Sequence, residues 1–447
     1  MPLDPRVKHS DSNITFVKIA LMANTASIKI LLNKIRWMLY ENASSVWDFI
    51  LLILGVPIKV NGTLNEDNKK IILYIGEFLP PRIPRLAKWT KRVGNYSTLL
   101  LCHKRGFFEK FSNPDIDQTI LFRNKWHLKR IIKSLPSLYI AHGFAPKSKA
   151  PYQAMQFLKK YQPNTPFVAD YQDVLAIYYG INPAQRWLKH ELPYEKLCMQ
   201  HADGIVAHSL EPREGMKLWD IKNKGKRLFF PIYCDNDSFS IPKKPFASDD
   251  IHMAYAGGVV GSHRDKRYFG DTQFHWLIEY LTQQKIHFHI YPSPTIQRAD
   301  YEEYEQIAKQ NDFFHFHHAV SQTVLSQELS QYHYGLMPFF GGSSDQSALK
   351  AKYATTLKLF NYAEAGIPII VGAGVTYQSW IVERYKLGLV IKQKEDFKDI
   401  RKYIEESPYS EQLKTVSEQR EALSLQKHIP RLIKFYEGLE RNIHKTN

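Results

Sequence analysis

Short apolar runs alternate with stretches of helical periodicity along most of the chain. The runs are too short for ordinary helices and are bounded by turn residues, so they predict buried strands. These strands are expected at residues 70–75, 98–102, 137–141, 166–169, 203–207, 251–256, 334–340, 369–371 and 388–391. Strands that alternate with helices in this way indicate Rossmann-like parallel sheets covered by helices.

The clearest strand–helix–strand unit spans residues 334–371. Its first strand is followed by a polar loop rich in Gly, Ser and Asp, and then by a helix-period segment that begins at Leu357. Gly366 ends this helix as its C-cap, and Pro368 lies just beyond it. Ligands of doubly wound sheets bind at the carboxyl ends of such strands, so this unit is the first place to look for a site.

A motif within this unit resembles a known family. Lys358-Leu-Phe-Asn-Tyr362 followed by Ala365-Gly-Ile-Pro368 is similar to the nucleotide-sugar-binding part of retaining GT-B glycosyltransferases, many of which carry Lys-Leu-Phe-Glu-Tyr followed by Ala-Gly-x-Pro. The resemblance implies that Thr355, Thr356 and Leu357, at the helix N-terminus, face the donor diphosphate. Bare amide donors and the helix dipole suit an anion there.

The same resemblance implies where the donor ribose binds. The family's second acidic residue, which holds the ribose, falls five positions before the glycine that ends the helix. Here Asn361 stands at that position, and Glu364 follows one turn later. A neutral amide still hydrogen-bonds a hydroxyl, although more weakly than a carboxylate. Asn361 and Glu364 are therefore the candidate ribose contacts.

A glycine-rich loop opens the second half of the chain. The strand at 251–256 leads into the segment 257–266, and a strand that enters a glycine-rich loop with cations suits a diphosphate. Related glycosyltransferases have Gly-Arg at the start of this loop and Lys further on, whereas this chain has Gly258 at the Arg position. The expected donor-binding residues here are Gly257, Gly258, Gly261, Arg264 and Lys266.

Several polar residues of the first half are expected to line the cleft. Arg82 and Arg85 lie on the predicted loop after the first strand, and a solvated basic face is an equally good interpretation of each. His142 and Asp173 follow predicted strands, although Asp173 is equally well explained as a helix cap. Glu195 to Ala202, with Asp203 and Ser209, resembles the family's Glu…Ala-Asp…Ser pattern.

Net charge favours an anionic partner. The chain carries a formal charge of +16. Residues 81–133 contain thirteen Lys or Arg against three acids, with Trp89 and Trp126 among them. This composition predicts a surface that meets an anionic membrane leaflet. RNA binding is the competing hypothesis, but none of the usual nucleic-acid motifs is present.

The N-terminal segment is apolar in two places. Residues 14–40 are predicted to be helical, and 49–58 form an uninterrupted apolar run of ten residues. A transmembrane helix needs about 20 residues. We therefore expect either an interfacial helix or re-entrant wedge, or a helical hairpin packed on the neighbouring domain. Periodicity does not separate these two alternatives.

Cysteines and histidines give weaker signals. Three separated cysteines without metal spacing indicate reduced thiols in a cytosolic protein, and no secretory signal is evident. His287 with His289, and the group at 315–318, lack a properly spaced carboxylate, so buried or cleft histidines are favoured over a metal site. No Asp-x-Asp donor-metal signature is clear, so neither metal nor cofactor is expected.

Together these patterns predict an α/β protein of the GT-B class, with two Rossmann-like domains facing a cleft. The expected parts are a helical, membrane-oriented extension at 1–68, an acceptor domain at 69–240, a nucleotide-sugar domain at 241–425 and a closing helix at 426–447 that crosses back to the first domain.

The resemblance implies transfer of a sugar, with retention, from a nucleotide sugar to a glycan or lipid-linked acceptor, in polysaccharide or glycoconjugate synthesis. The expected location is the inner face of a membrane, on the cytoplasmic side. Lys358 and Arg264 are expected to stabilise the departing diphosphate, with His142 as a third candidate catalytic residue. The alternatives are a GT-B-shaped sugar-nucleotide epimerase and a non-catalytic scaffold at a membrane.

Overall fold

A computed structural model describes residues 42–58, 69–77, 82–103, 114–145, 148–223, 225–243, 250–294, 297–341 and 345–446. The chain divides into two compact units. One comprises Met1–Val60 with Phe122–Leu135, and the other comprises Asn61–Leu121 with Pro136–Asn447. Both parallel sheets belong to the second unit, apart from the last residue of one edge strand.

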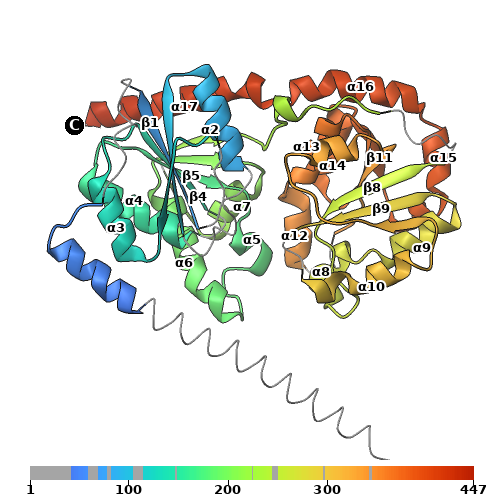
Figure 1. Ribbon diagram of the computed structural model, residues 1–447, viewed down its shortest axis with the longest axis horizontal. Helices are drawn as coiled ribbons and strands as arrows, with labels where there is room; N and C mark the ends of the chain where they lie inside the picture. Colours follow the sequence, from blue (N-terminus) through green and yellow to red (C-terminus); the bar gives the residue numbers. More distant parts are fainter. Residues whose placement is uncertain are drawn as a thin grey trace, which may run out of the picture. The chain divides into compact units, whose positions relative to one another are not determined.

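The first sheet has seven strands in the order β3-β2-β1-β4-β5-β6-β7 (Figure 1). Its strands are β1 (Lys70–Gly76), β2 (Tyr96–His103), β3 (Gln118–Phe122), β4 (Ile140–Phe144), β5 (Phe167–Tyr171), β6 (Gly204–Ala207) and β7 (Lys226–Phe229). The pairs from β2 through β7 are parallel. The helices between these strands are α2 (Arg82–Val93), α3 (Lys125–Ser134), α4 (Lys149–Tyr161), α5 (Leu175–Tyr179), α6 (Arg186–His201) and α7 (Glu211–Leu218).

The second sheet has six parallel strands in the order β10-β9-β8-β11-β12-β13. They are β8 (His252–Gly257), β9 (His287–Pro292), β10 (Phe314–Phe316), β11 (Tyr334–Met337), β12 (Ile369–Gly372) and β13 (Gly388–Ile391). Its helices are α8 (Lys266–Phe269), α9 (His275–Gln283), α10 (Arg298–Ala308), α11 (Leu325–Leu329), α12 (Asp345–Tyr353), α13 (Leu357–Ala365), α14 (Thr376–Arg384), α15 (Ile400–Glu405) and α16 (Tyr409–Ala422). Short 3-10 turns are η3 (Asn236–Ser238), η4 (Gly270–Thr272) and η5 (Lys394–Asp399).

The last helix, α17 (Leu425–Thr446), returns to the first sheet. Its apolar side chains, from Leu425 to Leu439, join the same core cluster as Ile72 and Tyr74 of β1. The chain therefore crosses back to the first Rossmann-like half after completing the second, and Figure 1 shows this long red helix running past β1 and α2.

The two predicted sheets are confirmed, but two predictions of local structure are wrong. Arg82 and Arg85 do not lie on a loop, because α2 already begins at Arg82. Pro84 within its first turn is compatible with a helix, since the first amide groups of a helix need no intrahelical acceptor. The predicted polar loop before α13 contains helix α12, whose sequence includes the helix formers Ala, Leu, Gln and Lys.

In the smaller unit, a helix over residues 42–53 is anchored by one buried carboxylate. Asp48 accepts hydrogen bonds from Arg123, Asn124 and Arg130 and is fully buried. Side chains on other faces of this helix, and just after it, are exposed: Val46, Trp47, Ile50, Ile53, Leu54 and Val56. The predicted helix at 14–40 lies outside the described residues.

The basic segment 81–133 is not an open cationic platform, which corrects the expectation from composition. Seven of its thirteen cations are in ion pairs with acids, and three more, Lys104, Arg105 and Lys110, lie outside the described residues. The paired cations are Arg82, Arg85, Lys88, Lys91, Arg92, Arg123 and Arg130. The search of the described residues finds no helix long and apolar enough to cross a membrane.

Candidate active site

The side chain of Lys358 lies beside the glycine-rich loop of the second sheet. Its Nζ is 5.4 Å from the ring centroid of Tyr255 and 5.6 Å from that of Phe339. No described residue gives this ammonium a hydrogen bond or an ion pair. Burial lowers the pKa of Lys358 to about 8, and no carboxylate raises it again. An amine in this position is ready to pair with an anion, because a bound anion would compensate its lost hydration.

The N-terminus of α13 adds donors next to this lysine. Thr356 is the N-cap residue, and its side chain caps no amide of the helix. The hydroxyls of Thr355 and Thr356 are buried and have no hydrogen-bond partner among the described residues. Amides at a helix N-terminus favour anions through both hydrogen bonding and the helix dipole. Lys358, Thr355, Thr356 and Leu357 thus form one anion-compatible corner.

Gly257 brings the loop after β8 against this corner. Its φ of 152° lies in the region that favours glycine, and an added Cβ would stand 2.2 Å from Cε of Lys358. Gly258, the next residue, has open space around it. At Gly261 an added Cβ would meet the ring of His263 at 2.6 Å.

The two cations predicted on this loop have different surroundings. Arg264 makes a bidentate ion pair with Asp300, with Nε–Oδ1 and Nη2–Oδ2 distances of 2.7 Å. Its charge is therefore already compensated, and its proposed action on a diphosphate requires this pair to open. Lys266 begins α8 and is exposed.

Asn361 and Glu364 lie on the same helix but have different partners. Asn361 Oδ1 accepts a hydrogen bond of 2.8 Å from Gln322 Nε2, which leaves its amide nitrogen as a donor. Glu364 is fully engaged: Arg85 donates to both carboxylate oxygens, and the amide of Asp235 donates to Oε1. Asn361 is thus the better placed of the two for a ribose contact, and Glu364 would have to leave its ion pair first.

His142 does not line a cleft, which corrects the placement expected from the sequence. It lies inside β4 and is fully buried. Nε2 is 2.9 Å from Asp170 Oδ2, and Nδ1 is 2.5 Å from the hydroxyl of Tyr436. Both ring nitrogens are therefore occupied within the core, which disfavours a role in proton transfer to a substrate.

Asp170 is surrounded by one guanidinium and two histidine rings in the same core. It contacts Arg82 and His208 as well as His142. Arg82 also donates to the carbonyls of Phe230 and Pro231 and is buried, so its guanidinium faces the core of the first half. Burial opposes ionisation of Asp170, but Arg82 and the histidines hold the pKa of its carboxyl well below the usual range.

Asp173 follows β5 and pairs with Lys350 of α12. Lys350 Nζ also lies 3.5 Å from Glu211 Oε1. Burial raises the pKa of Glu211 to about 7, although Lys350 acts in the opposite direction. This contact joins a loop and α7 of the first half to α12 of the second half. It could not be predicted, because the sequence pattern predicts a loop where α12 lies.

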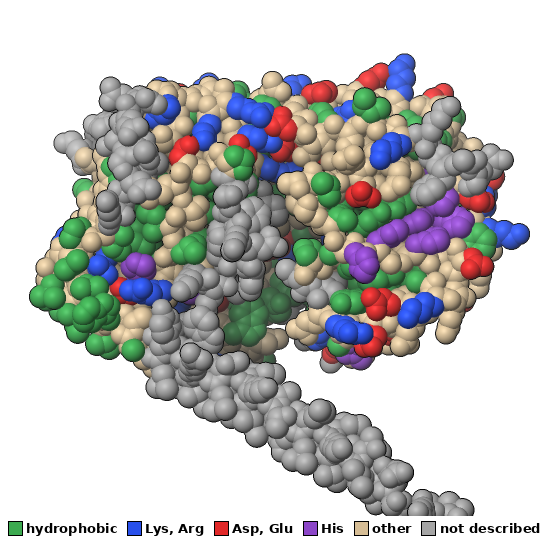
Figure 2. Space-filling model, in the orientation of Figure 1, with side chains coloured by type: hydrophobic (Ala, Val, Ile, Leu, Met, Phe, Trp, Pro, Cys, Tyr) green, Lys and Arg blue, Asp and Glu red, His purple; other side chains and the backbone are tan. Residues whose placement is uncertain are grey.

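Six histidines form a row across β8, β9, β10, the residue after β10 and the residue before β11. They are His252, His287, His289, His315, His317 and His333. His289 contacts two neighbours, with ring nitrogens 3.0 Å from His252 and 3.0 Å from His317. A parallel contact of 2.9 Å joins His287 to His315, and the amide of His252 donates to His333. Figure 2 shows histidine side chains gathered in one patch. In the described part of the chain, no group of three or more His, Cys, Asp or Glu has the arrangement of a metal site.

Sequence reasoning missed the partners that define these roles, namely Asp170, His208, Gln322, Asp300 and Lys350. Each is an ordinary polar residue without a motif, and its partner lies 28 to 177 positions away along the chain. Asp170 and His208 carried a positional signal, because each directly follows a predicted strand.

Comparison with known proteins supports the architecture. Residues 269–434 match the family described as "Glucosyltransferase 3-like, C-terminal domain". Sucrose-phosphate synthase from Thermosynechococcus elongatus is similar in structure, with a TM-score of 0.60 and 14% identity over 83% of this chain and 99% of that one. Comparison with curated proteins finds no significant match.

Two further solved structures share the fold. HepE from Anabaena, in complex with UDP-glucose, has a TM-score of 0.54 and 11% identity over 84% of this chain and 98% of that one. The N-terminal domain of trehalose-6-phosphate phosphatase from Candida albicans has a TM-score of 0.53 and 11% identity over 86% of this chain and 99% of that one. The chain thus has the GT-B fold, and its residues 269–434 are similar to the C-terminal domain of glucosyltransferase 3-like proteins.

Proposed function

We propose that this protein transfers a sugar, with retention of configuration, from a nucleoside diphosphate donor to a glycan or lipid-linked acceptor in polysaccharide or glycoconjugate synthesis. The observation that carries the proposal is the ammonium of Lys358. It lies without an anionic partner among the described residues, beside the open N-terminus of α13. A diphosphate supplies the two features that this corner lacks, which are negative charge and hydrogen-bond acceptors.

The chemistry follows from where charge develops. As the glycosidic bond to the diphosphate breaks, negative charge grows on the leaving phosphate. Lys358 and the first amides of α13 stabilise this charge without reorganising, which is preorganised electrostatic catalysis. In the retaining mechanism implied by the family resemblance, a donor phosphate oxygen takes the acceptor's proton on the same face of the sugar.

The first test compares the wild type with Lys358→Met. Uridine diphosphate is the first probe, because the similar HepE structure contains UDP-glucose. We expect Lys358→Met to weaken its binding in calorimetry and to lower sugar transfer on the order of 10²-fold or more. Lys352→Met, an exposed lysine on α12, is the matched control and keeps wild-type behaviour.

A folded Lys358→Met protein that transfers sugar at the wild-type rate would overturn this site assignment. If the wild type binds none of the common nucleoside diphosphates, the non-catalytic scaffold becomes the better hypothesis. Interconversion of the donor sugar without any acceptor would favour the epimerase.

We also propose that the protein works at the inner face of a membrane. Support comes from the smaller unit, where Trp47, Ile53 and Leu54 are between 57% and 68% exposed. Large apolar side chains gathered on one helix and its end form a patch that soluble proteins rarely expose without a partner. Lys125 and Lys133 are exposed on α3 of the same unit and suit an anionic surface.

A further inference from the structure

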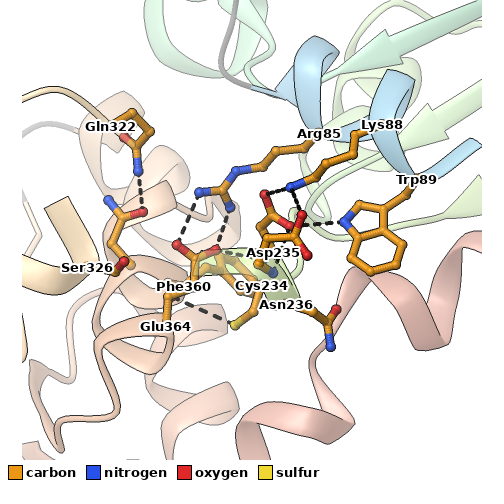
Figure 3. Close-up of polar contacts among 12 residues, drawn as sticks. Arg85, Lys88, Trp89, Cys234, Asp235, Asn236, Gln322, Ser326, Phe360 and Glu364 are labelled. Carbon is orange, nitrogen blue, oxygen red and sulfur yellow. Dashed lines mark hydrogen bonds and ion pairs between the residues drawn. The ribbon is translucent and has the colours of Figure 1, made fainter. Parts of the chain in front are cut away.

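A buried ion pair joins the two Rossmann-like halves of the larger unit. Nη1 and Nη2 of Arg85 lie 2.6 and 3.1 Å from the carboxylate oxygens of Glu364. Arg85 comes from α2 beside the first sheet, and Glu364 comes from α13 beside the second (Figure 3). Their side chains are 8% and 1% exposed, so neither is a surface ion pair that solvent screens.

The segment between the sheets reinforces this contact. The amide of Asp235 donates to Glu364 over 2.7 Å, while the Asp235 carboxylate accepts from Lys88 at 2.5 Å and from the indole of Trp89 at 3.0 Å. Lys88 and Trp89 lie on the same helix as Arg85, as Figure 3 shows. One face of α2 is therefore bonded both to the connecting segment and to α13.

The last turn of α13 has further backbone anchors. The carbonyl of Glu364 accepts from the amide of Ser240 at 2.8 Å, and the Arg420 guanidinium donates to the carbonyl of Ser240. Gly366 ends the helix with a φ of 77°, and an added Cβ would meet Pro242 at 3.0 Å. The C-terminal end of α13 is thus fixed on several sides, whereas its N-terminal end carries the open anion corner.

We propose that Arg85 and Glu364 are a positioning pair that sets the donor-binding helix α13 in register with the first half of the protein. This proposal rests on the proposed function, because it takes the N-terminus of α13 as the donor site. The helix has nine residues, and a rise of about 1.5 Å per residue makes it a short rigid rod. A shift of its anchored end therefore moves the donor relative to any acceptor bound by the first half.

The pair acts through the helix and touches neither substrate. Two other roles would require direct contact with a substrate. In one, Glu364 contacts the ribose of the donor, and in the other, Arg85 contacts the acceptor. Nucleotide is bound by the second half alone in this proposal, so losing the pair leaves nucleotide affinity almost unchanged. Transfer falls instead, because misplacing reacting groups by about 1 Å can cost about 10²-fold in rate.

The experiment uses Arg85→Met, Glu364→Gln and the double variant in the full-length chain. Arg92→Met is the matched control, since Arg92 lies on the same helix and pairs with Asp237 at an exposed site. Each protein is checked by thermal unfolding. We then measure the dissociation constant of UDP, transfer at saturating donor and acceptor, and hydrolysis of the donor by water.

We expect all four variants to bind UDP within about threefold of the wild type. Sugar transfer by Arg85→Met and by Glu364→Gln falls by about 10- to 100-fold. The double variant transfers sugar as fast as the less active of the two single variants. Arg92→Met transfers sugar at the wild-type rate. Hydrolysis falls less than transfer, because water needs no position on the first half.

Three results would overturn the positioning pair. Wild-type transfer in both single variants removes it outright. A large loss of UDP affinity in Glu364→Gln alone assigns this carboxylate to the ribose. A raised acceptor KM with normal turnover in Arg85→Met alone assigns this guanidinium to the acceptor.

A second readout separates the pair from the proposed function. Hydrogen exchange of the amides in α13 should be faster in Arg85→Met and Glu364→Gln than in the wild type and Arg92→Met. If the wild type neither binds nucleotide nor transfers sugar, the proposed function fails, yet exchange in α13 still tests whether the pair anchors the helix. Unchanged exchange in both variants contradicts the anchoring.

Discussion

Gly257 combines two requirements at one position. Its backbone φ is positive, and its missing side chain makes room for the stem of Lys358. Gly258 is its neighbour and meets neither requirement, since nothing lies within 4 Å of an added Cβ there. The adjacent glycines therefore form a matched pair for testing whether the position of Lys358 matters.

We predict that Gly257→Ala lowers sugar transfer far more than Gly258→Ala does. The added methyl group strains the backbone by roughly 1–3 kcal/mol and pushes Lys358 away from the N-terminus of α13. Transfer should drop at least about tenfold in Gly257→Ala and stay near the wild-type value in Gly258→Ala. Equal activity of the two variants would mean that the ammonium of Lys358 need not occupy its present position.

Residue roles were the hardest features to predict from sequence. Arg82 and Arg85 have the same type, lie three positions apart and looked equivalent as loop cations. Arg82 pairs with Asp170 in the core of the first half, whereas Arg85 pairs with Glu364 of the second. Their partners are 88 and 279 positions away, and local periodicity contains no information on contacts at that distance.

Elements were predicted far better than residue roles. Apolar runs located nine of the thirteen strands in the described residues, because strands buried on both faces must be continuously apolar. The strands β3, β7, β9 and β10 were not among those predicted. The errors in the helices have local causes. Helix α12 has little amphipathic pattern to reveal it, and Pro84 suggested a loop although the first turn of a helix accepts proline.

The histidine row on the strands of the second sheet should make the stability of the protein depend on pH. Burial lowers the pKa values of His252 and His317 to about 4, and it lowers that of His289 further. In the unfolded chain these rings titrate near 6.5, so the unfolded state binds more protons between pH 6.5 and pH 4. The free energy of unfolding therefore falls as the pH is lowered through this window. Asp250 opposes the lowering of the His252 pKa and Asp312 opposes that of the His315 pKa, but burial outweighs both carboxylates and the pKa of each ring stays below its usual value.

We predict that the melting temperature of the wild type falls more steeply below pH 6.5 than that of His289→Gln. The substitution removes the ring that contacts both His252 and His317, so less repulsion builds up on acidification. At pH 7.5 the wild type should have a higher melting temperature than His289→Gln. At pH 5 the difference between the two melting temperatures should be smaller by several degrees, since about 2–4 °C correspond to 1 kcal/mol for a domain of this size. If the melting temperatures of both proteins fall by the same amount across this pH range, the histidine row is not the cause of the acid destabilisation.

At the scale of the whole molecule, sequence reasoning predicted the GT-B architecture but overestimated the basic surface. Counting charges in residues 81–133 ignored their partners, and most of the described cations there are in ion pairs. The apolar run at 49–58 was the better signal, because exposure of its side chains does not depend on distant pairing. Membrane association is therefore expected to depend mainly on apolar contact.

A truncation is a poor test of this association. Residues 122–135 group with the N-terminal segment, and Arg123 and Arg130 both pair with Asp48. Removing Asp48 would leave Arg130 buried without its partner, which is strongly destabilising. Substitutions on the exposed side chains leave this anchor intact.

We predict that replacing Trp47, Ile50, Ile53 and Leu54 together by Ser releases the protein from vesicles. Full burial of one such side chain contributes about 1.5–3 kcal/mol, whereas each cation near an anionic leaflet adds about 1 kcal/mol. The wild type should co-sediment with anionic vesicles, lose only part of this binding at high salt, and keep most of it on neutral vesicles. The fourfold variant should stay in the supernatant under all three conditions.

The control replaces Trp187 and Ile241 by Ser, since these side chains are 48% and 85% exposed in the larger unit, and it should bind like the wild type. If the wild type remains in the supernatant with anionic vesicles at low salt, the membrane proposal fails. Residues 14–60 would then be better explained as a helical hairpin packed on the protein itself, which is the alternative that the sequence also predicts.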